Sequence, residues 1–287
     1  MNLAGRVALV TGSGRGIGRA IALALAQAGA DLVLIARTAS ELAETAEQVQ
    51  RLGRQSLQCR GDVSRRKDVE SAVAQGFGKF GRVDILVNNA ALQVPIGPLA
   101  ENDPEAWIRT VAVNLFGPFH CIQAVLPGMI ARKQGKIINV SGGGATAPRA
   151  NFSAYAASKA ALVRLTETLA EELKPYNIQV NAVAPGPVNT RMLDEILGAG
   201  PSAGPELEAA RKRKQDGGTP AELVAELVLL LASDASNGLS GKLISAPHDD
   251  WRDWGTARIA ALADSPWYTL RRMDPHTIRP LLKQLPD

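Results

Sequence analysis

The chain has 287 residues, 46% of them hydrophobic, so it can form one large α/β domain or two small ones and is not disordered as a whole. Its 32 basic and 28 acidic residues give a net charge of +4, a mild excess that excludes the basic surface of a typical nucleic-acid-binding protein. The two cysteines, Cys59 and Cys121, are too few for a disulfide framework or a zinc cluster, which indicates a reducing compartment.

The amino terminus shows no sign of an export signal. It reads MNLAGRVALVTG, without a charged start followed by a long apolar core. No later stretch approaches the roughly 18 apolar residues of a membrane-spanning helix. These features predict a soluble, cytoplasmic protein.

Short apolar runs rich in β-branched residues recur through the chain, with longer segments of helical composition between them. Strands that alternate with helices imply parallel crossovers, and near-continuous apolarity implies a sheet covered on both faces. We therefore expect an α/β fold with a doubly wound (Rossmann-type), mostly parallel seven-stranded sheet and helices on both faces. The expected strands are 7–11, 32–36, 56–60, 84–88, 136–140, 178–183 and 241–245.

A glycine-rich stretch, TGSGRGIG at 11–18, follows the first expected strand and opens an alanine-rich helix. Its glycines have the spacing G-x-x-x-G-x-G, at Gly12, Gly16 and Gly18. Glycines let the backbone approach a pyrophosphate closely, and a helix start supplies free N–H groups and partial positive charge. The stretch predicts a dinucleotide-binding loop, the alternative being a tight turn without a ligand.

The residues after the second expected strand bear on the choice of cofactor. An acidic residue at this place holds the ribose 2′-hydroxyl of NAD, whereas an arginine accommodates the 2′-phosphate of NADP. The strand ends at Ala36 and is followed by Arg37, with no carboxylate, and Arg15 lies in the glycine-rich loop. Two guanidinium groups can pair with one phosphate, which favours NADP(H) over NAD(H).

The stretch SAYAASK at 153–159 places Tyr155 and Lys159 four positions apart. On a helix these two side chains share one face. A phenol beside a fixed cation has its pKa lowered toward the physiological range, which would make Tyr155 a proton donor and acceptor. The alternative is a tyrosine that only packs and a lysine that only faces water.

Glycine, proline and serine gather at 197–206, which predicts a mobile loop followed by a short helix. The basic run 211–214 is typical of a solvated helix face; a landing site for an acidic carrier or a phosphate-bearing substrate is the alternative. We expect 192–218 to cover the substrate pocket. Its leucines suggest a partly apolar substrate or simple packing: Leu193, Leu197 and Leu207.

The chain continues after 245 and carries three of its four tryptophans there. We expect one domain over 1–245, and an aromatic-rich extension over 246–287 that packs on this body or on a partner subunit. His248, Asp249 and Asp250 are adjacent in sequence, and adjacent residues seldom bind one metal ion, so a structural role is expected and no metal site is predicted.

The glycine-rich loop and the Tyr155-x-x-x-Lys159 pair occur together with four further motifs in a fixed order: GDV at 61–63, NNAA at 88–91, VNLFG at 113–117 and APGPVNT at 184–190. With them the chain resembles the classical short-chain dehydrogenase/reductase (SDR) family over roughly 4–245. The resemblance implies a small-molecule carbonyl or alcohol substrate and a homodimer or homotetramer, with no nucleic-acid or membrane partner.

The resemblance also implies roles for individual residues. Tyr155 would be the general acid, Lys159 would lower its pKa and bind the nicotinamide ribose, and Asn114 would hold a water that links this lysine to solvent. Asp62 would bind adenine. Besides Tyr155 and Lys159, the cofactor-binding residues would be Gly12, Ser13, Gly14, Arg15, Gly16, Ile17, Gly18, Arg37, Asp62, Val63, Asn88, Ala90, Pro185, Gly186, Val188 and Thr190.

The expected catalytic serine departs from the family pattern. The family has N-I-S-S, with the second serine 13 positions before the tyrosine, whereas this chain has NVSGGG and Gly142 at that spacing. One extra residue in the following loop would bring Ser141 into place, and three consecutive glycines make such a shifted backbone feasible. We predict Ser141 as the catalytic serine; Ser153, Ser158 or a water are the alternatives.

These observations predict an NAD(P)(H)-dependent oxidoreductase that interconverts a ketone or aldehyde and an alcohol by hydride transfer, with a tyrosine as general acid and base. Two alternatives remain. Gly142 at the usual serine position motivates a catalytically impaired, cofactor-binding regulator or scaffold. The same fold also supports an epimerase or dehydratase.

Overall fold

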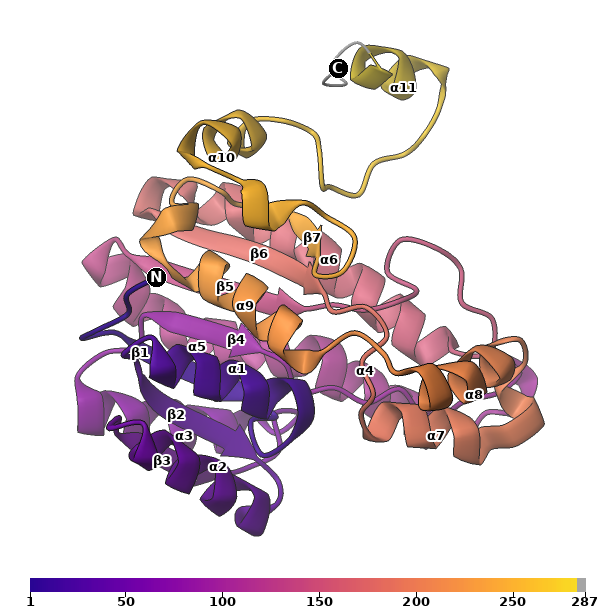
Figure 1. Cartoon of the computed structure of the whole chain (residues 1–287), viewed down its shortest axis with the longest axis horizontal. Coiled ribbons are helices and arrows are strands. Elements are labelled where there is room, and N and C mark those ends of the chain that lie inside the picture. Colours follow the sequence, from indigo (N-terminus) through magenta and orange to yellow (C-terminus); the bar gives the residue numbers. More distant parts are fainter. Residues whose placement is uncertain (283–287) are drawn as a thin grey trace.

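The computed structural model describes residues 1–282; the end of the expected extension, 283–287, lies outside the described part. A parallel seven-stranded sheet forms the centre, in the order β3-β2-β1-β4-β5-β6-β7 (Figure 1). This confirms the doubly wound α/β fold. The strands are β1 (Val7–Thr11), β2 (Asp31–Ala36), β3 (Ser56–Arg60), β4 (Ile85–Asn88), β5 (Gly135–Val140), β6 (Ile178–Ala184) and β7 (Leu243–Ser245).

The central strands are buried along their whole length, which explains their nearly continuous apolar sequences. Every residue of β1, β4 and β5 is buried because helices cover both faces of the sheet. The last strand is shorter than the sequence predicted, beginning at Leu243 instead of 241. The backbone of Gly241 has a left-handed φ of 74°, so this residue does not extend the strand.

Helices form a layer on each face (Figure 1). One layer packs with the carboxyl-terminal segment around a core of leucine, valine and alanine: α1 (Gly16–Gln27), α2 (Ala39–Arg51) and α9 (Ala221–Ala232). The other layer contains α3 (Arg66–Phe80), α4 (Pro104–Val111), α5 (Gly117–Arg132) and α6 (Ser153–Leu173). Short 3₁₀ turns lie at Leu99–Glu101, Lys174–Tyr176, Asp234–Ser236 and Trp251–Asp253.

A π-helical turn at Ala112–Phe116 joins α4 and α5 into one helical run, Pro104–Arg132. In the described part of the chain this run is the one helix long and apolar enough, by length and composition, to cross a membrane. Almost half of its apolar window is buried inside the fold, and core helices of globular domains pass the same test.

Two helices extend from the carboxyl-terminal end of the sheet: α7 (Arg191–Ala199) and α8 (Glu206–Asp216), joined by a 3₁₀ turn at Gly200–Ala203 (Figure 1). The expected loop at 197–206 is shorter, because α7 extends to Ala199, and the short helix expected after it is α8. We refer to Arg191–Asp216 as the lid. Its amphipathic sequence packs Leu193 and Ile196 into a small core with Phe152 and Tyr155.

The segment after β7 packs on the body of the same chain. Trp251 and Trp254 are buried in the core formed by α1 and α9, and the Trp251 indole donates a hydrogen bond to the Ala246 carbonyl oxygen. The backbone N–H of Leu243 donates to the carbonyl oxygen of Tyr268, which covers the open edge of β7. The helices here are α10 (Thr256–Ala263) and α11 (Pro275–Leu282), and Figure 1 shows α11 standing off from the body.

Candidate active site

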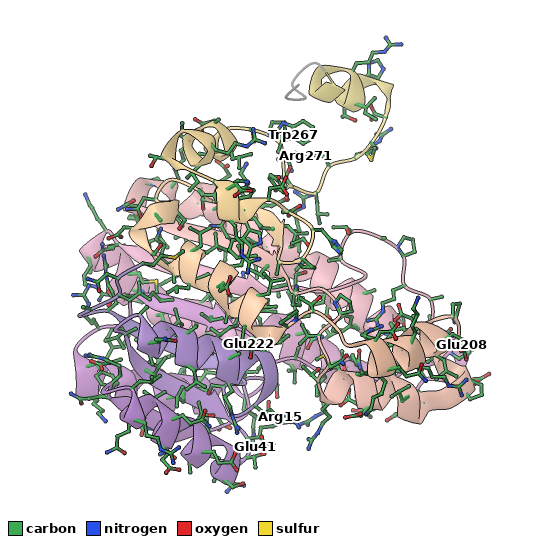
Figure 2. All side chains as sticks on the ribbon, viewed as in Figure 1. Arg15, Glu41, Glu208, Glu222, Trp267 and Arg271 are labelled. Atoms are coloured by element: carbon green, nitrogen blue, oxygen red, sulfur yellow. The ribbon has the colours of Figure 1, made fainter. Side chains whose placement is uncertain are left out.

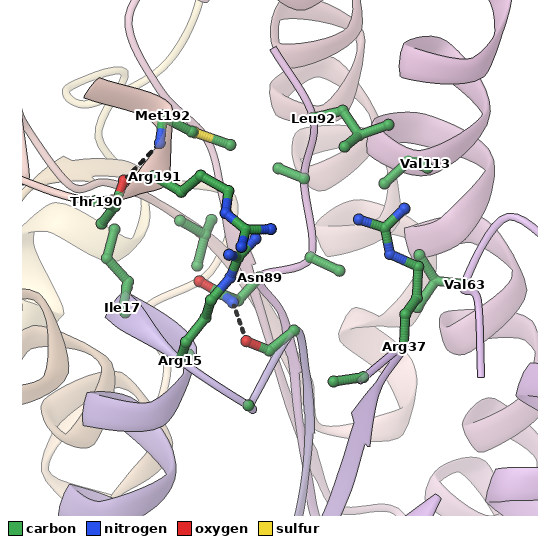
Figure 3. Close-up of a pocket in the computed structure, with 18 of the residues that line it drawn as sticks. Arg15, Ile17, Arg37, Val63, Asn89, Leu92, Val113, Thr190, Arg191 and Met192 are labelled. Atoms are coloured by element: carbon green, nitrogen blue, oxygen red, sulfur yellow. Dashed lines mark hydrogen bonds between the residues drawn. The ribbon is translucent and has the colours of Figure 1, made fainter. Parts of the chain in front are cut away.

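A cavity of about 560 Å³ lies where β1 and β4 are neighbours although they are not consecutive in the chain. In open α/β sheets ligands bind at such a switch point, beyond the carboxyl ends of the strands. The structure brings many of the predicted site residues into the cavity wall (Figure 3). They are Gly12, Gly14, Arg15, Gly16, Ile17, Gly18, Arg37, Asp62, Val63, Ala90, Ser141, Tyr155, Pro185 and Thr190.

The glycine-rich loop packs so tightly that side chains do not fit. A Cβ on Gly18 would lie 2.2 Å from the carbonyl oxygen of Gly12, and Gly12 itself has a left-handed φ of 64°. Helix α1 begins directly after Arg15, whose side chain does not cap it, so the first N–H groups of the helix stay available to an anion. The loop therefore fits the pyrophosphate of a dinucleotide.

Cations surround the cavity beyond this loop. Arg37 points into it from the end of β2, and Arg15 approaches from the opposite side (Figure 3). Arg15 lies 3.9 Å from Glu41, which also lines the cavity, whereas Arg37 forms no ion pair with any described residue. Arg37 is therefore the freer of the two guanidinium groups for a phosphate.

Asp62 is held at the edge of the cavity by several contacts. Its Oδ1 accepts hydrogen bonds from the hydroxyl and the backbone N–H of Ser64, and its Oδ2 lies 3.0 Å from the Arg109 guanidinium. Burial alone would raise the pKa of this carboxyl, but the Ser64 hydrogen bonds and the charges of Arg109 and Arg37 lower it overall. Asp62 is thus an ionised, oriented acceptor.

Ser141 directly follows β5 and faces the cavity. Its backbone N–H donates to the Val183 carbonyl oxygen on β6, so the sheet itself sets its position. The hydroxyl is buried and makes no hydrogen bond to any described residue. A buried hydroxyl without a partner is costly, and a substrate oxygen can satisfy it.

The other two candidate serines use their hydroxyls elsewhere. The Ser153 hydroxyl accepts from the Trp107 indole, and the Ser158 hydroxyl donates to the Tyr155 carbonyl oxygen and accepts from Asn114. Neither serine belongs to the cavity wall that the described residues form.

Gly142 leaves space for the Tyr155 hydroxyl. A Cβ on Gly142 would lie 2.1 Å from that hydroxyl oxygen and 3.0 Å from Cζ, so no larger residue fits while the ring keeps this position. The suggested shift of the glycine backbone is not needed, because Ser141 already continues the sheet, and of the three glycines only Gly144 has a left-handed φ.

The protonation of Tyr155 differs from the expectation. The phenol was expected to become more acidic beside Lys159, but burial raises its pKa above the ordinary value, with an opposing effect of Arg149 and a reinforcing one of Glu206. That expectation was therefore wrong for the protein as the structure describes it. Lys159 is itself nearly fully buried, and burial lowers its pKa to about 7, so it is not a fixed cation.

Lys159 and Asn114 lie behind the cavity wall. The Lys159 ammonium lies 5.7 Å from the centre of the Tyr155 ring and donates to the Val140 carbonyl oxygen at 2.7 Å. The Asn114 amide is bonded to the N–H and the carbonyl oxygen of Leu92 and to Ser158. Asn114 therefore joins the π-helical turn to the loop after β4 and to α6.

Some predicted cofactor residues do not line the cavity in the described part of the chain. The Asn88 amide faces inward and donates to Asn139, whereas its neighbour Asn89 lines the cavity and donates to backbone carbonyls of the glycine-rich loop. The Asn88 side chain is therefore not part of the cavity wall. Buried positions or packing contacts also keep three others out of the wall: Ser13, Gly186 and Val188.

The lid contributes residues that the sequence analysis did not identify. Arg191, Met192 and Glu195 line the cavity from α7, and the Arg191 guanidinium points into it (Figure 3). Burial raises the pKa of Glu195, while Gln93, Arg15, Arg191 and Arg37 oppose the shift, so these three arginines share one region. The lid leucines belong to the small core instead, which favours their role in packing.

Similarity to known proteins agrees with this architecture. A family model described as short chain dehydrogenase matches residues 6–199. The short chain dehydrogenase/reductase astE of Aspergillus oryzae is 40% identical over 248 residues, which are 85% of this chain and 94% of that protein. The 3-oxoacyl-acyl-carrier-protein reductase FabG of Thermotoga maritima is 35% identical over 244 residues, 85% of this chain and 97% of its own.

Among solved structures, carveol dehydrogenase from Mycobacterium avium in complex with NAD superposes with a TM-score of 0.78 at 31% identity. The match covers 85% of this chain and 96% of that one. The family model spans more than half of the chain, and both relatives exceed 30% identity over most of it. The chain belongs to the short-chain dehydrogenase/reductase family of oxidoreductases, which act on CH–OH groups with a nicotinamide cofactor.

Proposed function

We propose that the protein is an NADP(H)-dependent carbonyl reductase, reversible as an alcohol dehydrogenase, in which Tyr155 transfers the proton. The observation that carries this proposal is the pairing of two groups in one cavity wall. The unpartnered hydroxyl of Ser141 and the ring of Tyr155 both face the space beside the glycine-rich loop. A carbonyl oxygen held there would meet one hydrogen-bond donor and one proton donor.

Bound NADPH would supply the hydride that reduces the carbonyl carbon. The Ser141 hydroxyl would donate a hydrogen bond to the carbonyl oxygen and stabilise the negative charge that develops on it. Tyr155 would then give its phenolic proton to that oxygen, which completes the alcohol and leaves a phenolate. Lys159, whose pKa of about 7 lets it exchange protons at neutral pH, would return a proton to the phenolate.

The reaction is tested by incubating the purified protein with NADPH and a panel of ketones and aldehydes. We expect NADPH to raise the midpoint of thermal unfolding and to be oxidised in the presence of at least one carbonyl compound. Product formed without net oxidation of NADPH would indicate epimerase or dehydratase chemistry instead. Absence of both thermal protection and oxidation would contradict the proposal.

Arg37 supports the preference for NADP(H), since it points into the cavity without a carboxylate partner among the described residues. We expect Arg37→Ala to weaken NADPH binding by about 10- to 100-fold, because a charge-assisted contact to the 2′-phosphate contributes roughly 1.5–3 kcal/mol. NADH lacks this phosphate, so its affinity should change little. Fluorescence titration with both cofactors measures the difference.

An exposed arginine outside the cavity provides the control for this variant. Arg66 pairs with Glu70 on the surface of α3, and Arg66→Ala removes the same charge without touching the cavity. Its effect on NADPH should be small and should disappear at higher salt. If Arg37→Ala weakened NADH and NADPH equally, Arg37 would not select the phosphate and the preference for NADP(H) would be lost.

A further inference from the structure

Arg149, in the loop between β5 and α6, lies beside Tyr155, the candidate proton donor. The Arg149 guanidinium lies 3.8 Å from the centre of the Phe152 ring and 5.5 Å from the centre of the Tyr155 ring. Phe152 is fully buried, and little of the Arg149 side chain is exposed. A guanidinium in such a partly desolvated place acts on its neighbours more strongly than one at the surface.

The lid determines where this guanidinium lies. Arg149 donates Nε to Oε1 and Nη2 to Oε2 of Glu206, both at 2.9 Å, in a bidentate pair. Glu206 is the first residue of α8. The hydrogen bonds and charge of Arg149 lower the pKa of the Glu206 carboxyl, with burial opposing them, so the pair is ionised.

The charges that face Tyr155 come from three elements. Lys159 on α6 loses its proton near neutral pH, because burial lowers its pKa to about 7. Glu206 on α8 disfavours the phenolate and is itself faced by Arg213. Arg149 remains charged throughout the working range, because a guanidinium does not deprotonate in proteins. At alkaline pH it is the lasting cation beside the phenol.

We propose that Arg149 is a positioning residue for proton transfer: it orders the Tyr155 ring and stabilises the phenolate, and Glu206 makes this effect depend on the packing of the lid. The part concerning catalysis rests on the proposed function, whereas the electrostatic part is independent of it. A lid that lies on substrate would thus hold Arg149 beside the phenol, and a displaced lid would release it. The position of the lid over the substrate would in this way influence the pKa of the Tyr155 phenol.

Titration of the phenol itself tests the electrostatic part without any substrate. In the full chain carrying Tyr176→Phe and Tyr268→Phe, Tyr155 is the only tyrosine left, and 3,5-difluorotyrosine incorporated there ionises at a lower pH than tyrosine does. We expect Arg149→Met to raise the pKa of this phenol by about half a unit or more, because a stabilising cation is removed. Arg149→Lys, which keeps the charge, should restore at least half of the shift.

A double-mutant cycle of Arg149→Met and Glu206→Gln measures how far the effect of Arg149 on the phenol depends on the lid. Once Glu206→Gln has released the guanidinium, Arg149→Met should shift the phenol much less than it does in the parent. Glu208→Gln is the matched control on the same helix, because Glu208 pairs with Arg211 at the surface (Figure 2). In the protein that carries Glu208→Gln, Arg149→Met should raise the pKa of the phenol as much as it does in the parent.

Thermal unfolding and NADPH binding, measured on every variant, show whether the fold is retained. If Arg149→Met leaves the titration unchanged in a folded protein, the electrostatic role is overturned. If the effects of Arg149→Met and Glu206→Gln simply add, the coupling to the lid is overturned. If the phenol shifts as expected but no carbonyl compound is reduced, the proposed reaction fails while the electrostatic role of Arg149 stands.

Discussion

Gly142→Ser should inactivate the protein, although it restores the serine that the family usually has at this spacing. A Cβ at this position would lie 2.1 Å from the Tyr155 hydroxyl oxygen, so either the ring or the backbone at residue 142 must shift and their relative position changes. Overpacking of this kind costs about 1–3 kcal/mol of unfolding free energy. A displacement of the proton donor by about 1 Å can lower turnover by about 100-fold. Chemical denaturation and steady-state kinetics measure the two effects.

Gly143→Ser is a closely matched control. Gly143 is exposed, its φ is not left-handed, and a Cβ there would meet nothing within 4 Å, so this variant should keep its stability and activity. A second control is the double variant with Tyr155→Phe. Because the hydroxyl makes the closest contact, Gly142→Ser should destabilise the protein less when Tyr155→Phe is also present than it destabilises the parent.

The same variant separates the proposed enzyme from a regulator with impaired chemistry. A vestigial active site that had lost its serine should gain activity when the serine returns. The structure instead places Ser141 in the cavity wall and fills the space at Gly142 with the tyrosine hydroxyl. A large gain in turnover for Gly142→Ser would contradict this arrangement and favour the regulator.

The sheet could be predicted from the sequence because burial on both faces leaves a plain signal. Strands β1, β4 and β5 are buried at every position, so they appear as short apolar runs within one residue of the predicted bounds. The glycine-rich loop can also be recognised in the sequence, because the close approach of Gly18 to the Gly12 carbonyl oxygen lies within the loop itself. Features set by neighbouring residues in sequence are accessible without a structure.

The site features that were missed depend on contacts between distant parts of the chain. Arg149 and Glu206 are 57 positions apart, and nothing near either residue indicates the bidentate pair. The acidity of Tyr155 was predicted from its spacing to Lys159 alone, whereas burial raises the pKa of the phenol and lowers that of the amine. Desolvation depends on the whole surrounding structure, so the sign of such a shift cannot be read from a motif.

The direction in which each side chain points was also hard to predict from the sequence. The motif at 88–91 lies beside the cavity, but successive side chains at a strand end point to opposite sides. Asn88 therefore turns inward to Asn139 while Asn89 faces the glycine-rich loop. The tryptophans of the carboxyl-terminal segment illustrate the same point, since their sequence predicted packing but not which face of the sheet they cover.

Tyr155→Phe should reduce turnover by about 100- to 10,000-fold, because it removes the one proton donor proposed for the carbonyl oxygen. Tyr155 lines the cavity and its ring packs against Phe152 and the lid, so phenylalanine keeps the ring contacts. Stability and NADPH affinity should therefore change little. Steady-state oxidation of NADPH, with cofactor binding measured separately by fluorescence, distinguishes loss of chemistry from loss of binding.

Tyr176→Phe removes the same hydroxyl from an exposed turn that does not line the cavity, and this variant should retain parent activity. The pH profile adds a further requirement. If Tyr155 supplies the proton, the parent activity should fall at alkaline pH as the phenol ionises, and the residual activity of Tyr155→Phe should not, because phenylalanine does not titrate. Substantial residual turnover with an unchanged alkaline limb would assign the proton transfer to another group, with the Ser141 hydroxyl or a water as the first to examine.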